Sequence, residues 1–140
     1  MKLKFLFLSI LVLAVSIAAI TVSASAVELK AGLSVSGTWF ELYLGQIHYN
    51  GPSSTLTIIE VNGDVARVSY SWGKAPTWNI NKSGSFELVA PVTREENIKK
   101  IEFKSPRSGN NFTFIFDPTD PLIRGRCRTT KGWILSIEMQ

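Results

Sequence analysis

From Val35 onward, apolar and polar residues alternate in short runs with a period close to two. Turn-forming residues interrupt these runs about every ten positions, which is typical of an antiparallel all-β fold. The pattern predicts eight strands, at residues 37–44, 55–61, 64–72, 85–92, 98–104, 110–116, 122–128 and 133–139.

The turns between these runs predict how the strands connect. Asn62-Gly63 is the sharpest hairpin signal, because a type I′ turn needs two left-handed residues and Asn-Gly accepts both. Residues 93–96, Thr-Arg-Glu-Glu, have the form of a capping box, and we expect a loop or a single helical turn there. Connections after the first strand are short, so neighbours in sequence should be neighbours in space.

Eight strands joined in this way predict an up-and-down meander that closes into a β-barrel, which leaves no free sheet edges. On the third strand, Ala66, Val68, Tyr70 and Trp72 share one face and should point inward. A barrel of this size is just wide enough to be filled by side chains or to hold one small ligand. The alternation favours neither outcome.

The N-terminal residues carry the features of a secretory signal. Two lysines precede a nearly unbroken apolar stretch, Phe5 to Ile20, and Ala24-Ser25-Ala26 supplies small residues at a cleavage site. We therefore expect residues 1–26 to be a signal peptide and residues 27–140 to be a single β-barrel domain. The alternative is an uncleaved anchor, since the apolar stretch approaches the ~20 residues that span a bilayer.

Charge and location follow from that cleavage. The whole chain has a net charge of +4, and loss of Lys2 and Lys4 lowers it to +2. A charge this small gives no reason to expect a nucleic-acid partner, or a membrane partner once the signal is removed. The expected location is secreted or periplasmic.

The start of the barrel resembles a known superfamily. Gly37-Thr38-Trp39 on the first strand, the eight-strand meander and the export signal together resemble the lipocalin/calycin superfamily, whose strand-one tryptophan closes one end of the barrel. The stretch Tyr70-Ser71-Trp72-Gly73, with Pro76-Thr77-Trp78, is also similar to uncharacterised bacterial lipocalin-like domains. The resemblance implies a fold and a bacterial source, and no particular activity.

Residues that carry catalysis are scarce. His48 is the only histidine and Cys127 the only cysteine, so no zinc-ligand spacing and no internal disulfide exist. Cys127 lies between Arg126 and Arg128, which would favour a reactive thiolate, but a buried apolar role in a strand is the preferred interpretation. Asp117 and Asp120 offer calcium too few oxygens. We expect neither an enzyme nor a cofactor.

Aromatic residues are the side chains best suited to form a binding site in this chain. Rings with a polar tip suit a pocket, but a small barrel without disulfides also needs large rings to fill its core. Trp72 and Trp78, which flank the loop at residues 73–77, are the pair least easily explained by the core alone. Arg124, Arg126 and Arg128 alternate on one strand; a solvated face is the preferred interpretation, and Arg126 is the best inward candidate.

These observations predict an exported, non-enzymatic binding protein that holds a small amphipathic or apolar ligand in or at the mouth of the barrel. The expected ligand-binding residues are Trp39, Tyr43, Tyr70, Trp72, Trp78 and Arg126. The alternative is a protein-interaction or hydrolase-inhibitor module with a filled core, which would act through loops and the basic strand face. In that case the partner is a protein.

Overall fold

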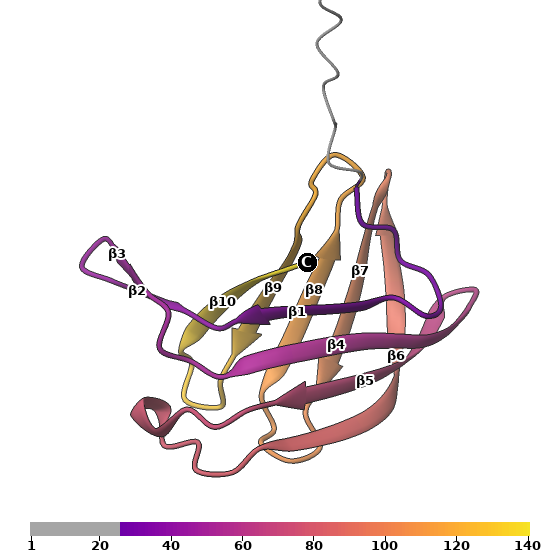
Figure 1. The fold of residues 1–140 in the computed structure, drawn as a ribbon. Coiled ribbons are helices and arrows are strands. Elements are labelled where there is room, and N and C mark those ends of the chain that lie inside the picture. Colours follow the sequence, from indigo (N-terminus) through magenta and orange to yellow (C-terminus); the bar gives the residue numbers. More distant parts are fainter. Residues whose placement is uncertain (1–25) are drawn as a thin grey trace, which may run out of the picture.

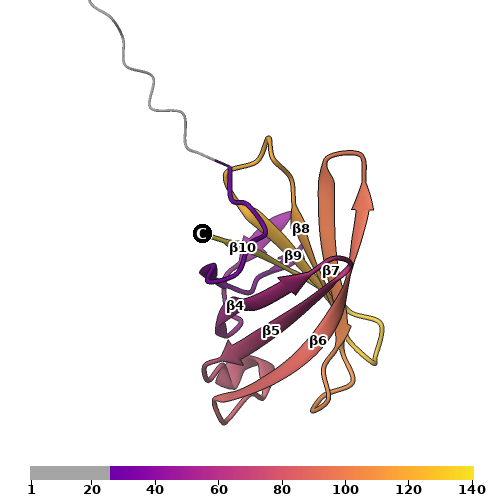
Figure 2. The ribbon, with the colours of Figure 1, turned by 90° about the vertical axis from the view of Figure 1, so that its right-hand side faces the viewer.

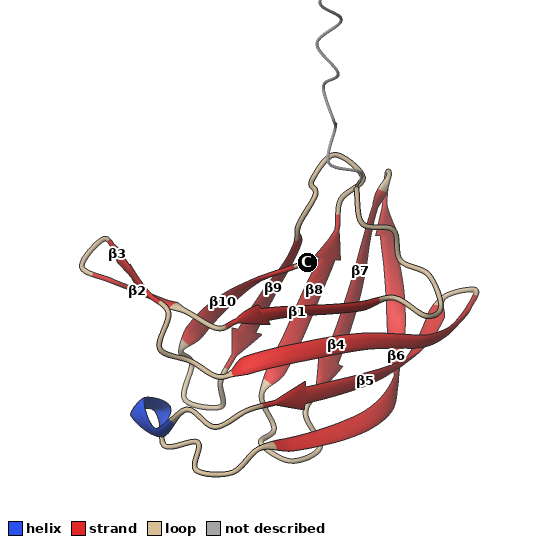
Figure 3. Cartoon of the chain, viewed as in Figure 1, coloured by secondary structure: helices blue, strands red, loops and turns tan. Residues whose placement is uncertain are grey.

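Eight antiparallel strands wind into a nearly closed barrel in the computed structural model, which describes residues 26–140 (Figure 1). In order around the barrel they are β1 (Ser34–Thr38), β4 (Ser53–Asn62), β5 (Val65–Trp72), β6 (Gly84–Glu95), β7 (Ile98–Lys104), β8 (Asn111–Phe116), β9 (Ile123–Arg128) and β10 (Ile134–Met139). Two short strands, β2 (Glu41–Tyr43) and β3 (Gln46–His48), form a separate hairpin. The 3₁₀ turn η1 (Pro76–Trp78) is the only helical element within residues 26–140 (Figure 3).

The first and last strands meet along a seam. Ser36 and Gln140 exchange two backbone hydrogen bonds of 3.1 Å, and Phe40 and Ser136 exchange two of 2.8 and 3.1 Å. Gly37 lies between these two pairs, where a Cβ atom would collide with the carbonyl oxygen of Glu138. Glycine is therefore required at this position for the two strands to approach each other.

The barrel is incomplete between β6 and β7. The two strands pair only at the end where they are joined, Val92–Glu95 against Ile98–Ile101. From Gly84 to Pro91, β6 pairs with β5 alone, so the two strands separate towards the other end of the barrel (Figure 2). Phe86 and Leu88, which point inward from β6, are only half-buried as a result.

Inward-pointing side chains from every barrel strand form one core. The fully buried members include Leu56, Ile58, Val68, Ile101, Phe114, Ile123, Ile137 and Met139. The segment before β1 also contributes, since Leu29 is buried in this core and Val27 packs against it. The domain thus relies on apolar burial for its stability, because its one cysteine, Cys127, is free.

The predicted fold class is confirmed. The all-β architecture, the eight strands and the up-and-down order are as the alternation indicated, and the 98–104 strand has the predicted bounds. Ala66, Val68 and Tyr70 are buried as predicted, and Trp72 is half-buried. A tight turn joins β4 and β5 as predicted, but Asn62 pairs with Val65 in the ladder and only Gly63 has a positive φ, of 58°, so the expected pair of left-handed residues is absent. The predicted signal peptide, residues 1–26, lies outside the described residues except for Ala26.

Two further local predictions were wrong. The expected first strand at 37–44 is broken: β1 ends at Thr38, and the chain then forms the β2–β3 hairpin, whose turn places Leu44 and Gly45 at φ angles of 50° and 76°. The expected loop at residues 93–96 is instead the end of β6 and a tight turn, with Glu96 at a φ of 54°. No helix within residues 26–140 is long and apolar enough to cross a membrane.

Candidate functional site

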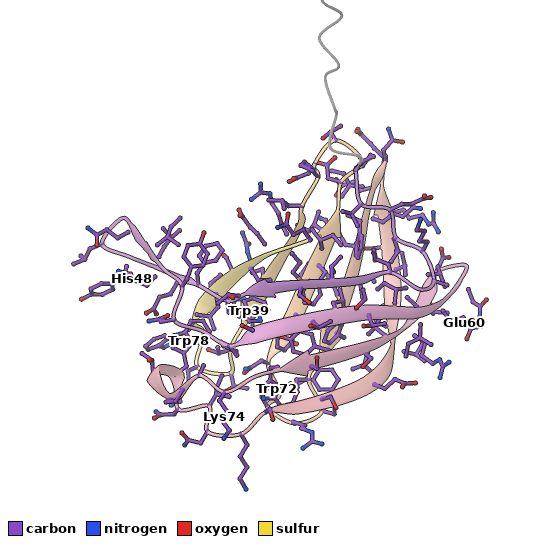
Figure 4. All side chains as sticks on the ribbon, viewed as in Figure 1. Trp39, His48, Glu60, Trp72, Lys74 and Trp78 are labelled. Atoms are coloured by element: carbon purple, nitrogen blue, oxygen red, sulfur yellow. The ribbon has the colours of Figure 1, made fainter. Side chains whose placement is uncertain are left out.

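An apolar cavity of about 210 Å³ opens at the end of the barrel where β6 and β7 separate. Trp39, Trp72 and Trp78 lie towards this end (Figure 4). Its walls are Trp39, Pro52, Tyr70, Trp72, Trp78, Ile80, Phe86, Phe112, Cys127 and Leu135, and its rim adds Ser105, Arg107, Ser108 and Asn110. The cavity therefore combines an aromatic interior with polar groups on one side.

Trp39 and Tyr70 form the floor of the cavity, and a closed hydrogen-bond network joins them to Ser54, which does not line it. The indole Nε1 of Trp39 donates to the hydroxyl oxygens of Tyr70 at 2.7 Å and Ser54 at 3.1 Å, and the Tyr70 hydroxyl donates to Ser54 Oγ at 3.0 Å. All three residues are buried. Burial raises the pKa of Tyr70 to about 12, although its hydrogen bonds to Ser54 and Trp39 oppose this shift. The floor is thus uncharged and held in one geometry.

Aromatic rings surround this floor. The Tyr70 ring lies 5.1 Å from that of Phe112 and 5.5 Å from that of Phe86, and Trp72 lies 5.9 Å from Phe86. Gly84 on β6 makes room for Trp72, because a Cβ atom there would collide with the indole. Rings in offset or edge contact stabilise one another beyond their area burial, so these rings form a rigid wall.

Trp78 is positioned on the opposite side by the loop before β4. Its Nε1 donates to Asn50 Oδ1 at 2.8 Å, and the Asn50 amide donates to Glu41 Oε1 at 3.3 Å. Gly51 lies between Trp78 and Trp39, where a Cβ atom would be 2.6 Å from carbon atoms of both. Contact across this glycine fixes the separation of the two tryptophans.

The rim is the loop between β7 and β8. Ser105 is buried, and its hydroxyl accepts hydrogen bonds of 3.2 Å from the backbone N–H groups of Arg107 and Ser108. Among the described residues, Arg107 is the only charged one that lines the cavity. The loop is therefore held in shape while it offers a cation and hydrogen-bonding groups at the opening.

Cys127 lines the cavity from β9 but is not activated. Its side chain is buried, and burial raises the pKa of the thiol to about 11. Arg126 and Arg128 point to the other face of the strand, so they do not favour the thiolate. The burial that the sequence analysis preferred for Cys127 is confirmed.

The predicted site residues fall into two groups. Trp39, Tyr70, Trp72 and Trp78 come together around the cavity. Tyr43 does not: it lies on β2 with 64 % of its surface exposed. Arg126 also does not, because Arg124, Arg126 and Arg128 all face solvent, so the inward candidacy of Arg126 was wrong while the preferred solvated face is confirmed.

Several lining residues were not in the predicted site. Phe86 and Phe112 carry a signal, since both belong to alternating runs, but alternation does not distinguish core from cavity. Arg107 and Asn110 carry no sequence signal of a binding site, because they lie in an ordinary Ser-Pro turn. The position of this turn at the cavity opening depends on how the strands pair. His48, on β3, is not among the lining residues.

Within residues 26–140, no group of three histidine, cysteine or acidic side chains is placed to hold a metal ion. Comparisons with protein-family models, curated protein sequences and solved structures returned no match. A function must therefore be inferred from the geometry and lining of the cavity.

Proposed function

We propose that this protein is an exported, non-enzymatic binding protein that holds a small amphipathic or apolar ligand in the cavity at the end of its barrel. The observation that carries the proposal is the aromatic cavity itself, lined by Tyr70, Trp72, Trp78, Phe86 and Phe112. Binding pockets are mostly apolar, with a few polar groups that orient the ligand. This cavity has both parts.

Size limits the ligand class. The cavity holds about 210 Å³. An engineered cavity of about 150 Å³ in another protein takes up benzene, whereas pockets for drug-sized ligands begin at about 300 Å³. The ligand we propose therefore has one ring or a short alkyl chain inside the barrel. A larger ligand would leave part of its length outside.

Polarity limits its orientation. Arg107, Ser108 and Asn110 lie on the rim, whereas the polar atoms of the floor residues Trp39 and Tyr70 are bonded to each other and to Ser54. A ligand with an apolar body and an anionic head would place the body against the rings and the head at Arg107, where a charge-assisted hydrogen bond is available. A small carboxylate with a phenyl or alkyl body fits this description.

A role without catalysis is supported by the lining chemistry. Among the described residues around the cavity there is no carboxylate and no imidazole, and the Cys127 thiol has a raised pKa of about 11. General acid–base or nucleophilic catalysis needs a group that is poised near the working pH. The aromatic cavity at the end of the barrel supports binding over the interaction module, which needs no such cavity.

We also propose that the barrel is lipocalin-like in the finer sense of the superfamily. Eight up-and-down strands and Gly37-Thr38-Trp39 at the first strand support this, with Trp39 on the floor at one end. Two phenylalanine rings pack edge-on against Trp39. The ring centroids of Phe112 and Phe114 lie 5.7 and 6.4 Å from that of Trp39.

The test is a binding measurement with a blocked cavity. Calorimetric titration with 3-phenylpropionate and octanoate, and with the uncharged amide of each, should show binding, with the carboxylates tighter than the amides. Ile80→Phe adds a ring at the cavity wall and should weaken binding at least tenfold. Val89→Phe makes the same kind of change on the exposed outer face of β6 and is the matched control.

Two results would separate the parts of the proposal. If carboxylates and amides bind equally, the cavity is a site but Arg107 does not orient the ligand. If none of the probes binds and native mass spectrometry of the exported protein finds no small molecule, the binding function is wrong.

A further inference from the structure

The β2–β3 hairpin projects from the side of the barrel and has one apolar face (Figure 1). Leu42 and Ile47 are cross-strand partners on this face, and the Tyr49 ring lies 5.1 Å from that of Phe40. Leu44, in the turn, is 86 % exposed and Leu42 is 68 % exposed. An isolated two-stranded hairpin has only marginal stability in water. An exposed apolar face on such a hairpin therefore indicates a binding surface.

This apolar face continues onto the outside of the barrel. Phe40 pairs with Ser136 of β10, and β2 lies against β10, the strand that carries the exposed side chain of Ile134. We call Leu42, Leu44, Ile47, Tyr49 and Ile134 the outer apolar patch. Phe40 is buried beneath Tyr49 and outside the main core, so the hairpin is anchored to the barrel wall.

Basic residues flank the patch. Ile134 pairs with Arg128 and Ser136 with Arg126, so both arginines share the outer face with the patch, and Lys131 lies in the exposed turn between β9 and β10. We call Arg126, Arg128 and Lys131 the basic flank. Within residues 26–140 no acidic side chain lies within 4.0 Å of their charged groups, whereas the neighbouring Arg124 is paired with Asp120 and Glu138.

We propose that this face docks on the surface of an anionic lipid bilayer, with the hairpin inserted at the headgroup level. The apolar tip offers burial, and the basic flank offers attraction to anionic lipid, the two terms that drive peripheral binding. Three residues of strand span about 10 Å, and interfacial elements insert roughly 5–10 Å. Trp133 and Tyr49, both exposed, are residue types that favour the interface.

A second copy of the chain fits this face less well. A two-fold contact presents the same patch from both partners, so it would bring Arg126 and Arg128 of one copy towards those of the other. Like charges in such a contact disfavour it, whereas anionic headgroups neutralise them. The net charge of the chain gave no reason to expect a membrane partner, but net charge does not report how the charges are distributed over the surface.

The experiment is vesicle co-sedimentation of residues 26–140, which contain all barrel strands and their core. Vesicles of equal parts phosphatidylglycerol and phosphatidylcholine are compared with vesicles of phosphatidylcholine alone. The protein should bind the anionic vesicles, with affinity that falls as salt rises, and tryptophan emission, to which the exposed Trp133 contributes, should shift to the blue. Each basic residue near the surface contributes about fivefold, or ~1 kcal/mol, so replacing the basic flank with glutamine should weaken binding by more than tenfold.

Matched variants separate this face from general effects. Leu44→Asn should reduce binding without loss of fold, because asparagine tolerates the positive φ of 50° at this turn. Val89→Ser removes an apolar side chain of β6 that is 63 % exposed, and should leave binding unchanged. Glutamine at Lys30, Lys82 and Lys104 together removes the same charge from other exposed positions, and should weaken binding much less than glutamine at the basic flank.

Two outcomes would overturn the proposal. One is the absence of binding to anionic vesicles, or binding that neither Leu44→Asn nor the basic-flank variant weakens. The other is a dimer in analytical ultracentrifugation that Leu44→Asn dissociates, together with no lipid binding, which would assign the patch to a second copy.

Discussion

Gly51→Ala is the most direct probe of how the cavity is held open. An alanine Cβ would lie 2.6 Å from Trp39 Cβ, 2.6 Å from Trp78 Cη2 and 2.7 Å from the Trp39 carbonyl oxygen. Carbon atoms in contact are ordinarily about 3.5–4.0 Å apart. The methyl group thus overlaps both tryptophans by about 1 Å.

The structure shows which neighbour must move. The Gly51 amide donates to the Trp39 carbonyl at 3.0 Å, and the Trp39 indole is held by Ser54 and Tyr70. Trp78 is only half-buried, so it should swing away and lose its hydrogen bond to Asn50.

The magnitude follows from opposing terms. Overpacking costs about 1–3 kcal/mol, and the lost hydrogen bond adds roughly 1 kcal/mol. Alanine offsets about 0.4–1 kcal/mol of this by restricting the unfolded chain. A net loss of about 1–3 kcal/mol lowers the Tm of a domain of this size by roughly 4–12 °C.

Thermal unfolding followed by circular dichroism measures this effect, and tryptophan emission reports the exposure of Trp78. Gly73→Ala is the control, since its Cβ would meet only the Ser53 carbonyl oxygen, at an ordinary 3.7 Å. We expect the control to keep or slightly raise the Tm. Equal Tm values for the two variants, with unchanged emission, would refute the reasoning.

Three further predictions concern titration, thiol reactivity and processing. The free energy of unfolding should fall by on the order of 2–3 kcal/mol between pH 10 and 12. The reason is that Tyr70 has a pKa of about 12 in the folded state, whereas in the unfolded state it ionises near 10. Urea denaturation over this pH range measures the fall, and the Tyr70→Phe variant should lack it. Cys127, buried and with its pKa raised to about 11, should react with an aromatic disulfide at pH 8 only in denaturant, and fast reaction of the native protein would contradict its placement. Mass spectrometry of the exported protein should give a chain that begins at Val27, and a retained residue Met1 would support the anchor instead.

Much of the fold was predictable because each barrel strand has one buried face, and burial imposes the period-two pattern. The run Ala66, Val68, Tyr70 shows this directly, since each of the three is buried. The β2–β3 hairpin was not predicted because this link between pattern and burial fails there. Leu42, Leu44 and Ile47 are apolar but exposed, so their pattern resembles that of a core strand. Leu44-Gly45 also lacks the usual Asn-Gly turn signal.

The turn at residues 93–96 shows a local signal that tertiary pairing overrides. Thr93 and Glu96 have capping-box spacing, but Thr93 pairs with Lys100 and Glu95 with Ile98 in the β6–β7 ladder. A short helix would forfeit these backbone hydrogen bonds, so the strand is more stable.

The aromatic part of the candidate site could be predicted from the sequence, but its opening and its rim could not. Trp72 and Trp78 flank a loop and were recognised as rings that the core alone does not require, and both line the cavity. The opening depends on the separation of β6 and β7, a property of non-local pairing that sequence periodicity does not encode. Arg107 and Asn110 become rim residues only through that separation, and the face of Arg126 depends on strand register.

The central claim is that the cavity accepts one small amphipathic molecule with its polar end at Arg107. The most direct measurement is a crystal structure of the protein soaked with octanoate or 3-phenylpropionate. We predict density for the apolar body between Trp72 and Phe112, with the carboxylate at the Arg107 loop. A cavity filled by a rotated Trp78 or Phe86 side chain, with no ligand density, would contradict the account.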